Sequence, residues 1–209
     1  VNVTGAMAGG TGNHITASGT QNLETIVVTG DKAITLGNVL DVTKLTDFSL
    51  ASTGGAVTVG TLDASAATAD IAVTQITASS STHGAVIGNI DVTGLNTTAS
   101  GVLTTLSATG VGTAGGQDAT IGTVGADTVG TITATSTAQD ASIGAITVGA
   151  DTAGDLTDGT VTAIKASGKI QATIGNIAAD TVSAITAEST DTVTGGASVI
   201  GTITDGNAG

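Results

Sequence analysis

Two carboxylates recur at the same place in two copies of a short pattern. Asp118 and Asp140 each follow a Gln, and each stands three residues before an Ile-Gly pair. If these copies form adjacent strands, the two side chains stack about 5 Å apart. Like charges at that distance repel unless solvent, a proton or a cation relieves them. Calcium accepts such oxygen ligands in flexible geometries.

Three further carboxylates form a second series, because Asp127, Asp151 and Asp180 stand in Gly-Ala-Asp-Thr or Ala-Ala-Asp-Thr. All five aspartates are therefore candidate calcium ligands. The alternative, which we favour, is that each Asp makes an Asx turn at a solvated corner. A dedicated calcium loop places more ligands in a single turn than this chain does.

Catalytic chemistry has little support. His14 and His83 are isolated in polar stretches, and no nucleophile motif surrounds the Ser residues. Sugar-cleaving sites need paired acids or a basic residue in a cleft, usually beside aromatic rings, but this chain has no Arg, Trp or Tyr. We expect no enzyme, and a carbohydrate-active β-helix is the least favoured alternative.

Composition excludes several other classes. The 209 residues carry a formal net charge of −13, with Phe48 as the single aromatic and no Cys. An acidic chain without Arg is a poor ligand for nucleic acid. Disulfide scaffolds need Cys, and a transmembrane helix needs an apolar run of about 18 residues, which is absent. We therefore expect neither nucleic-acid binding nor membrane insertion.

The elements that position these residues are short repeats in two forms. The first form has an aliphatic residue, Gly, any residue, a second aliphatic, any residue, then Ala or Val. It begins at Val59, Ile87, Ile121, Ile143, Ile174 and Ile200, with a probable copy at Leu36. The second form keeps the aliphatic spacing and ends in Ala; it begins at Val73, Leu103, Val129, Val161 and Val182. The two forms alternate from residue 59 onward, and Gly-form copies stand 22 to 34 residues apart.

Spacing inside each copy predicts strands and corners. Ala85 and Ile87 alternate, as do Ile90 and Val92, which places each pair on one face of a strand. The three-residue step from Ile87 to Ile90 breaks this parity, so two very short strands must meet at a corner that contains Gly. The aliphatic residues of all copies should share one narrow core.

This pattern predicts an all-β fold, a parallel β-helix (a right-handed β-solenoid) with about seven irregular coils of roughly 22–34 residues. We expect one domain over residues 1–209, with 1–35 less regular and 36–209 built from the alternating motifs. Neither end shows a polar cap, which suggests an excerpt of a longer array or assembly through open ends.

Outward residues of the second form line up as a row of hydroxyls. The row comprises Thr77, Ser79, Ser107, Thr109, Thr133, Thr135, Ser167 and Thr186, interrupted by Lys165 and Glu188. A Thr/Ser ladder resembles the surface of ice-binding β-helices, which is an alternative function. Thr also suits any solvated strand face, and we favour that explanation.

The runs Ser142-Ile-Gly-Ala-Ile-Thr-Val-Gly-Ala-Asp151 and Gln21–Leu36 resemble the Thr/Gly-rich β-solenoid repeats of bacterial S-layer and giant cell-surface proteins. The Gly-Gly-x-Gly-x-Asp calcium repeats of such proteins are missing here, so their calcium sites do not transfer. The resemblance implies an extracellular structural segment of an S-layer, surface filament or adhesin-like protein. The expected partners are further copies of the chain in a sheet or fibre, and a cell-surface glycan.

Overall fold

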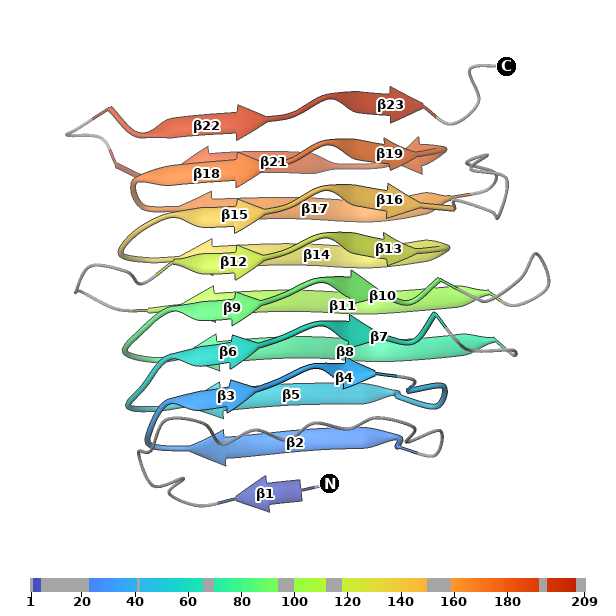
Figure 1. The fold of residues 1–209 in the computed structure, drawn as a ribbon. Coiled ribbons are helices and arrows are strands. Elements are labelled where there is room, and N and C mark those ends of the chain that lie inside the picture. The colour runs from blue at the N-terminus through green and yellow to red at the C-terminus, as the bar shows by residue number, and fades with distance from the viewer. Residues whose placement is uncertain are drawn as a thin grey trace.

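The computed structural model describes residues 2–4, 23–40, 42–65, 70–93, 100–111, 118–149, 159–191 and 195–205. Within these ranges the chain forms strands, turns and bends, and no helix. The strands pair in parallel and lie in three sheets stacked along one axis (Figure 1). The predicted parallel β-helix is confirmed.

We name the sheets A, B and C. Sheet A holds the longest strands: β1 (Asn2–Thr4), β2 (Thr25–Gly30), β5 (Asp47–Ser52), β8 (Ile71–Ser80), β11 (Gly101–Gly110), β14 (Thr128–Ser136), β17 (Thr160–Gly168), β20 (Thr181–Val182) and β21 (Ile185–Ser189). Sheet B holds β4 (Val39–Leu40), β7 (Leu62–Asp63), β10 (Ile90–Asp91), β13 (Val124–Ala126), β16 (Ile146–Val148), β19 (Ile177–Ala179) and β23 (Ile203–Asp205). Sheet C holds β3 (Ile34–Leu36), β6 (Val57–Val59), β9 (Ala85–Ile87), β12 (Ala119–Ile121), β15 (Ala141–Ile143), β18 (Gln171–Ile174) and β22 (Ala197–Ile200).

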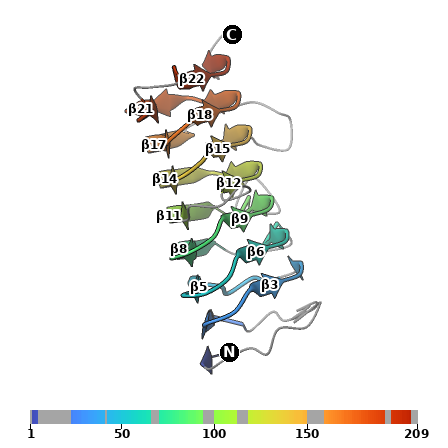
Figure 2. The ribbon, with the colours of Figure 1, turned by 90° about the vertical axis from the view of Figure 1, so that its left-hand side faces the viewer.

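Each coil passes through sheet A, then C, then B, and the next coil stacks above it. Sheets B and C are both seven-stranded, which agrees with the predicted number of coils. Figures 1 and 2 show sheets C and B on one side of the rod and sheet A on the other, and the chain winds around the rod in a right-handed sense. Strand register makes the coils unequal: Ala85 pairs with Ala119, 34 residues later, and Ala119 with Ala141, 22 residues later.

The core is a stack of inward aliphatic residues, as the motif spacing predicts. Ile87, Ile90, Ile121, Val124, Ile143, Ile146, Ile174 and Ile177 are at most 2% exposed. A second column in sheet A is small, because Ala78, Ala108, Ala134 and Ala166 pair in register. Phe48 is fully buried and stacks in register on Ile76. Small columns beside large ones give a narrow, filled interior.

Sheet A departs from the expectation that all strands are very short. β8 and β11 each run for 10 residues. In the first part of β8 the odd-numbered residues Ile71 and Val73 point inward, whereas in the second part the even-numbered residues Ile76, Ala78 and Ser80 do. In β8 the change occurs where Thr74 and Gln75 both lie outside, and the Thr46 carbonyl accepts both of their N–H groups, at 2.7 and 3.3 Å. The three-residue step is thus a local kink, and β8, β11, β14 and β17 keep the same register on both sides of it. In the last coil the strand is divided at this point into β20 and β21.

The corner between sheets C and B has two residues in every coil, and its glycine is required by close stacking. A Cβ on Gly122 would lie 2.6 Å from Asn89 Oδ1 and 2.8 Å from the Gly88 carbonyl. Positive φ is not the reason, since among the described glycines only Gly149 and Gly195 have it. The coil-length differences therefore come from the other two corners; nine residues, 92–100, separate β10 from β11, but Asp127 alone separates β13 from β14.

Asparagine at this corner stabilises the next coil. Asn89 Oδ1 accepts the Thr123 N–H at 3.1 Å, and Asn38 and Asn176 do the same for Thr61 and Thr202, each at 3.0 Å. An amide oxygen thus satisfies a backbone donor at the turn. The bond accounts for the Asn at these corners; the donor is a backbone N–H, which any residue other than Pro would supply at the Thr position.

Candidate functional site

The structure brings Asp118 and Asp140 together. They directly precede β12 and β15, whose residues Ala119 and Ala141 are register partners. Asp118 Oδ1 lies 3.4 Å from the Asp140 N–H, and the Asp140 carbonyl accepts the Ala119 N–H at 3.0 Å. Asp140 Oδ1 is buried and has no hydrogen-bond partner among the described residues. The predicted stack of two carboxylates is present, with one oxygen unsatisfied.

The second aspartate series is not contiguous. The register Thr128–Thr160–Thr181 places Gly159 in the coil between Asp127 and Asp180. Asp127 Oδ2 accepts the Gly101 N–H, and the Asp127 N–H donates to the Gly101 carbonyl at 2.9 Å. Asp127 therefore bridges two neighbouring coils at a corner, which is a contact between coils and not the local Asx turn of the alternative. Asp151, like His14, lies outside the described residues.

Sequence reasoning missed a second stacked pair, Asp63 and Asp91, which are register partners on the outer face of sheet B. Asp63 Oδ1 accepts the N–H and hydroxyl of Ser65 at 2.9 and 2.6 Å. Asp91 Oδ1 accepts the same groups of Thr93 at 3.1 and 2.6 Å. Both are Asx turns. The available signal was an Asp directly after the second aliphatic residue in two successive Gly-form copies.

These two carboxylates line a shallow depression of about 390 Å³ on sheet B. Gly125, which follows Asp91 in register, forms part of its wall, with Asn89, Thr123 and Thr147 around it. The lining offers oxygens and an amide but no aromatic ring. Across the part of the chain that the structure describes, no three His, Cys, Asp or Glu residues gather where they could hold a metal ion.

His83 belongs to a corner and not to a site. It is exposed in the turn between β8 and β9, where its N–H donates to Ser80 Oγ at 2.9 Å. Its ring nitrogen Nδ1 lies 2.9 Å from the Thr82 hydroxyl. Both contacts are local, so the geometry assembles no proton-transfer pair around it.

Buried serines at the same corner were also missed. Ser80 Oγ donates to the Gly55 carbonyl of the preceding coil at 2.8 Å, and Ser52 Oγ donates to the Lys32 carbonyl at 2.6 Å. Each also accepts an N–H three residues later, as Ser136 does from Gln139 at 3.0 Å. The signal is visible in the sequence, because each second-form copy continues to Ser or Gly two residues after its Ala.

The hydroxyl ladder of sheet A exists as predicted. Thr77 pairs in register with Ser107, and Ser107 pairs with Thr133; Ser79, Thr109 and Thr135 form the row beside them. The ladder begins one coil earlier, where Ser49 Oγ accepts the Thr77 hydroxyl at 3.0 Å.

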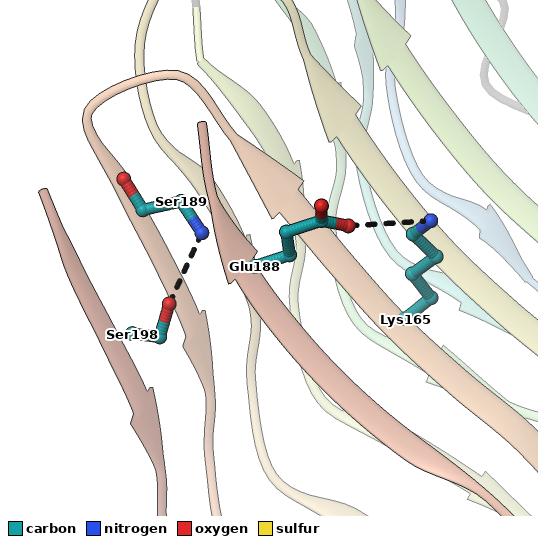
Figure 3. A network of polar contacts seen from close by, with 4 residues as sticks. All are labelled: Lys165, Glu188, Ser189 and Ser198. Atoms are coloured by element: carbon teal, nitrogen blue, oxygen red, sulfur yellow. Dashed lines mark hydrogen bonds and ion pairs between the residues drawn. The ribbon is translucent and has the colours of Figure 1, made fainter. Parts of the chain in front are cut away.

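Charges enter this ladder only towards the C-terminal coils. Lys165 on β17 and Glu188 on the neighbouring strand β21 form an ion pair, with 3.6 Å between Nζ and Oε2, and both side chains are half exposed (Figure 3). Figure 3 also shows the Ser189 N–H donating to Ser198 Oγ, at 3.1 Å, which joins sheet A to β22. An exposed ion pair contributes little stability, so Lys165 and Glu188 matter here as interruptions of the ladder.

The C-terminal coil leaves core positions open. Ile200 and Ile203 pair with the buried Ile174 and Ile177 but are 42% and 53% exposed, whereas Ile34 and Leu36 in the first full coil are 2% exposed. Val199, which is 45% exposed, is an outward residue that pairs with Thr173. β22 and β23 each pair on one side only, with β18 and β19. This end therefore presents both unpaired backbone groups and apolar side chains.

Within the described ranges there is no helix of the length and hydrophobicity needed to cross a membrane. No protein-family model, curated protein or solved structure matches this chain.

Proposed function

We propose that this protein is a structural β-solenoid of the bacterial cell surface, a segment of an S-layer, filament or adhesin-like protein, that acts by self-assembly and not by catalysis. The observation that carries the proposal is the edge of the last described coil, whose strands β22 and β23 have a paired neighbour on one side only among the described residues. There, Ile200 and Ile203 continue the aliphatic columns of the core but remain about half exposed.

Addition of a further coil would satisfy this edge in two ways. The unpaired N–H and C=O groups of β22 and β23 would gain parallel partners, which is β-strand addition. The exposed aliphatic side chains would gain a layer above them, worth about 25 cal/mol for each Å² of apolar surface removed from water. A second copy has one-sided strands at its other end, because within the described ranges sheets B and C begin at β4 and β3, although Ile34, Leu36 and Val39 of these strands are at most 2% exposed.

Contacts of this kind join unlike ends, so they propagate into a fibre unless the rotation closes a ring. Continuous ladders through stacked copies would make a stiff rod. The extracellular location is supported by the Thr/Gly-rich composition and by the resemblance to cell-surface solenoids, and the absence of Cys is compatible with any compartment. A cell-surface glycan remains a second expected partner, which the hydroxyl ladder could contact.

Ice binding is the second candidate, favoured by the unbroken ladder through β8, β11 and β14. Two features weaken it. Two of the six ladder positions in these strands, Ser79 and Ser107, lack the Thr methyl group. Lys165 and Glu188 interrupt the ladder in the next coils. Assembly is therefore the better-supported function.

The test is sedimentation velocity and electron microscopy of the full chain over a range of concentrations. We expect fibres or oligomers that grow with concentration, and Ile203→Lys should shift them to small species by placing a charge on the open edge. Thr147→Lys is the matched control, because Thr147 is exposed on the outer face of sheet B. A wild-type monomer at every concentration would overturn the proposal.

A further inference from the structure

One broad face of this acidic rod carries no charge. The outward residues of β8, β11 and β14 define it, and we call it the neutral face. They are Ala72, Thr74, Gln75, Thr77, Ser79, Val102, Thr104, Thr105, Ser107, Thr109, Thr128, Gly130, Thr131, Thr133 and Thr135. The whole chain has a formal net charge of −13.

The acidic residues lie on other surfaces. Asp63 and Asp91 project from the outer face of sheet B. Asp118 and Asp140 precede sheet C, and Asp127 stands at the corner before β14. Two copies that approach through any of these surfaces bring like charges together, which costs free energy. Asp70, which is exposed, directly precedes β8, so the neutral face has acidic residues at its edge but none within it. The outward residues of sheet C are also uncharged, but its strands are only three or four residues long, so the neutral face is the wider of the two surfaces.

We propose that two copies pair laterally, neutral face against neutral face. This inference rests on the proposed structural function and adds a lateral contact to the end-to-end one. Figure 1 shows the sheet A strands stacked one above the other behind sheets B and C, and the register repeats from β8 to β11 to β14. A surface that repeats in this regular way can pair with a second copy of itself in an isologous contact.

The area is sufficient for a stable pair. The strands β5, β8, β11, β14 and β17 have 6, 10, 10, 9 and 9 residues, which at about 3.3 Å per residue and about 4.8 Å between strands cover roughly 700 Å². A standard-size protein interface buries about 800 Å² on each partner. β8, β11 and β14 with their neighbours β5 and β17 supply these five strands. The Thr methyls, Val102 and Ala72 supply the apolar part of this contact.

The charges that flank the neutral face are complementary. Asp47 lies on β5 and Lys165 on β17, each two strands away from β11. A two-fold axis along β11 relates antiparallel rods and places Asp47 on the strand opposite the partner's Lys165. The ion pair with Glu188 leaves the Lys165 side chain 50% exposed, so it can serve a second carboxylate.

The experiment uses Ile203→Lys as the background, because it blocks end-to-end growth without touching the neutral face. We expect this variant to sediment as a discrete dimer at high concentration. Adding Thr109→Glu, which places two like carboxylates near the two-fold axis, should raise the dimer dissociation constant by about tenfold or more. Adding Thr58→Glu is the matched control, since Thr58 lies on the outer face of sheet C, and it should leave the dimer intact.

The outcomes separate the two proposals. Long fibres in the Ile203→Lys background would overturn the end-to-end contact and leave lateral pairing to be judged by Thr109→Glu alone. A monomer in that background, with fibres for the wild type, would overturn lateral pairing and keep the proposed function. If the protein is a monomer that shows thermal hysteresis, and Thr109→Glu abolishes this hysteresis, lateral pairing is also overturned. The neutral face would then be an ice-binding surface.

Discussion

At the scale of single residues, each inward aliphatic side chain packs against its counterparts in the coils below and above. Ile146 stands between Val124 and Ile177 in register and is 1% exposed. Such a column has few ways to collapse when a side chain is shortened, because the backbone ladders on both sides hold the coil spacing constant.

We therefore expect Ile146→Ala to lower the free energy of unfolding by about 2–5 kcal/mol, through lost burial and an unfilled cavity. Urea denaturation monitored by circular dichroism measures it. Thr147→Ala, on the exposed side of the same strand, should change stability by no more than about 0.5 kcal/mol. Equal stability of the two variants would contradict the packing described for this column.

The stacked carboxylates Asp118 and Asp140 make a second prediction at this scale. Asp140 has a buried, unsatisfied oxygen beside another carboxylate. A bound cation would relieve both the repulsion and the missing contact. We expect the wild-type protein to melt at a higher temperature in millimolar calcium than in chelator, and Asp140→Asn to shrink that difference.

The control for this calcium prediction is Asp31→Asn, which removes the same charge at an exposed turn. It should keep the wild-type response to calcium. A wild-type melting temperature that is the same in calcium and in chelator would remove calcium from the account and leave Asx turns as the role of these aspartates.

At the scale of elements, the invariant two-residue corner organises the coil. Backbone contact there is so close that the glycines of successive coils stack directly, as Gly88 does on Gly60 and Gly122 on Gly88. The remaining corners carry the insertions, so each coil can change length without disturbing the ladders. Function that depends on loop sequence can vary at those two corners while the core stays the same.

We expect Gly122→Ala to destabilise the protein by about 1–3 kcal/mol, because the added methyl group meets backbone of the coil below. Gly125→Ala is the matched control three residues away, where a Cβ would have its nearest neighbours at 3.6 Å. It should be neutral or up to about 1 kcal/mol stabilising, since alanine restricts the unfolded chain. Thermal unfolding of both variants tests this prediction. A Gly122→Ala variant with the melting temperature of the wild type would refute the close-stacking explanation.

At the scale of the whole molecule, the rod is stable by nearest-neighbour contacts between coils. Interior coils have neighbours on both sides, whereas the C-terminal coil has one. The terminal strands β22 and β23 should therefore open first, and assembly should protect them by adding the missing neighbour.

Hydrogen exchange monitored by mass spectrometry measures this gradient. In the isolated Ile203→Lys variant we expect fast exchange in β22 and β23 and the slowest exchange in β11 and β14. In wild-type assemblies β22 and β23 should become protected while β11 changes less. Equal protection of the C-terminal strands in both samples would argue against the open edge as the assembly site.

The sequence by itself determined the parts of this fold that depend on local parity. Aliphatic residues recur at every second position, apart from one three-residue step, and this pattern places each of them on the inside. The spacing between Gly-form copies reproduces the strand register of sheet C from Val59 onward. The core and the Asp118–Asp140 stack follow from these local rules, because each inward or corner position is set by its immediate neighbours in the chain.

Only the tertiary structure decided which residues meet across coils that carry insertions. Gly159 came between Asp127 and Asp180 because the chain leaves and rejoins the stack with corners of different length. The continuous strands of sheet A, its neutral face and the open C-terminal coil also depend on register between coils. Hydrogen bonding and burial between distant segments set that register, and the periodicity within one segment does not contain it.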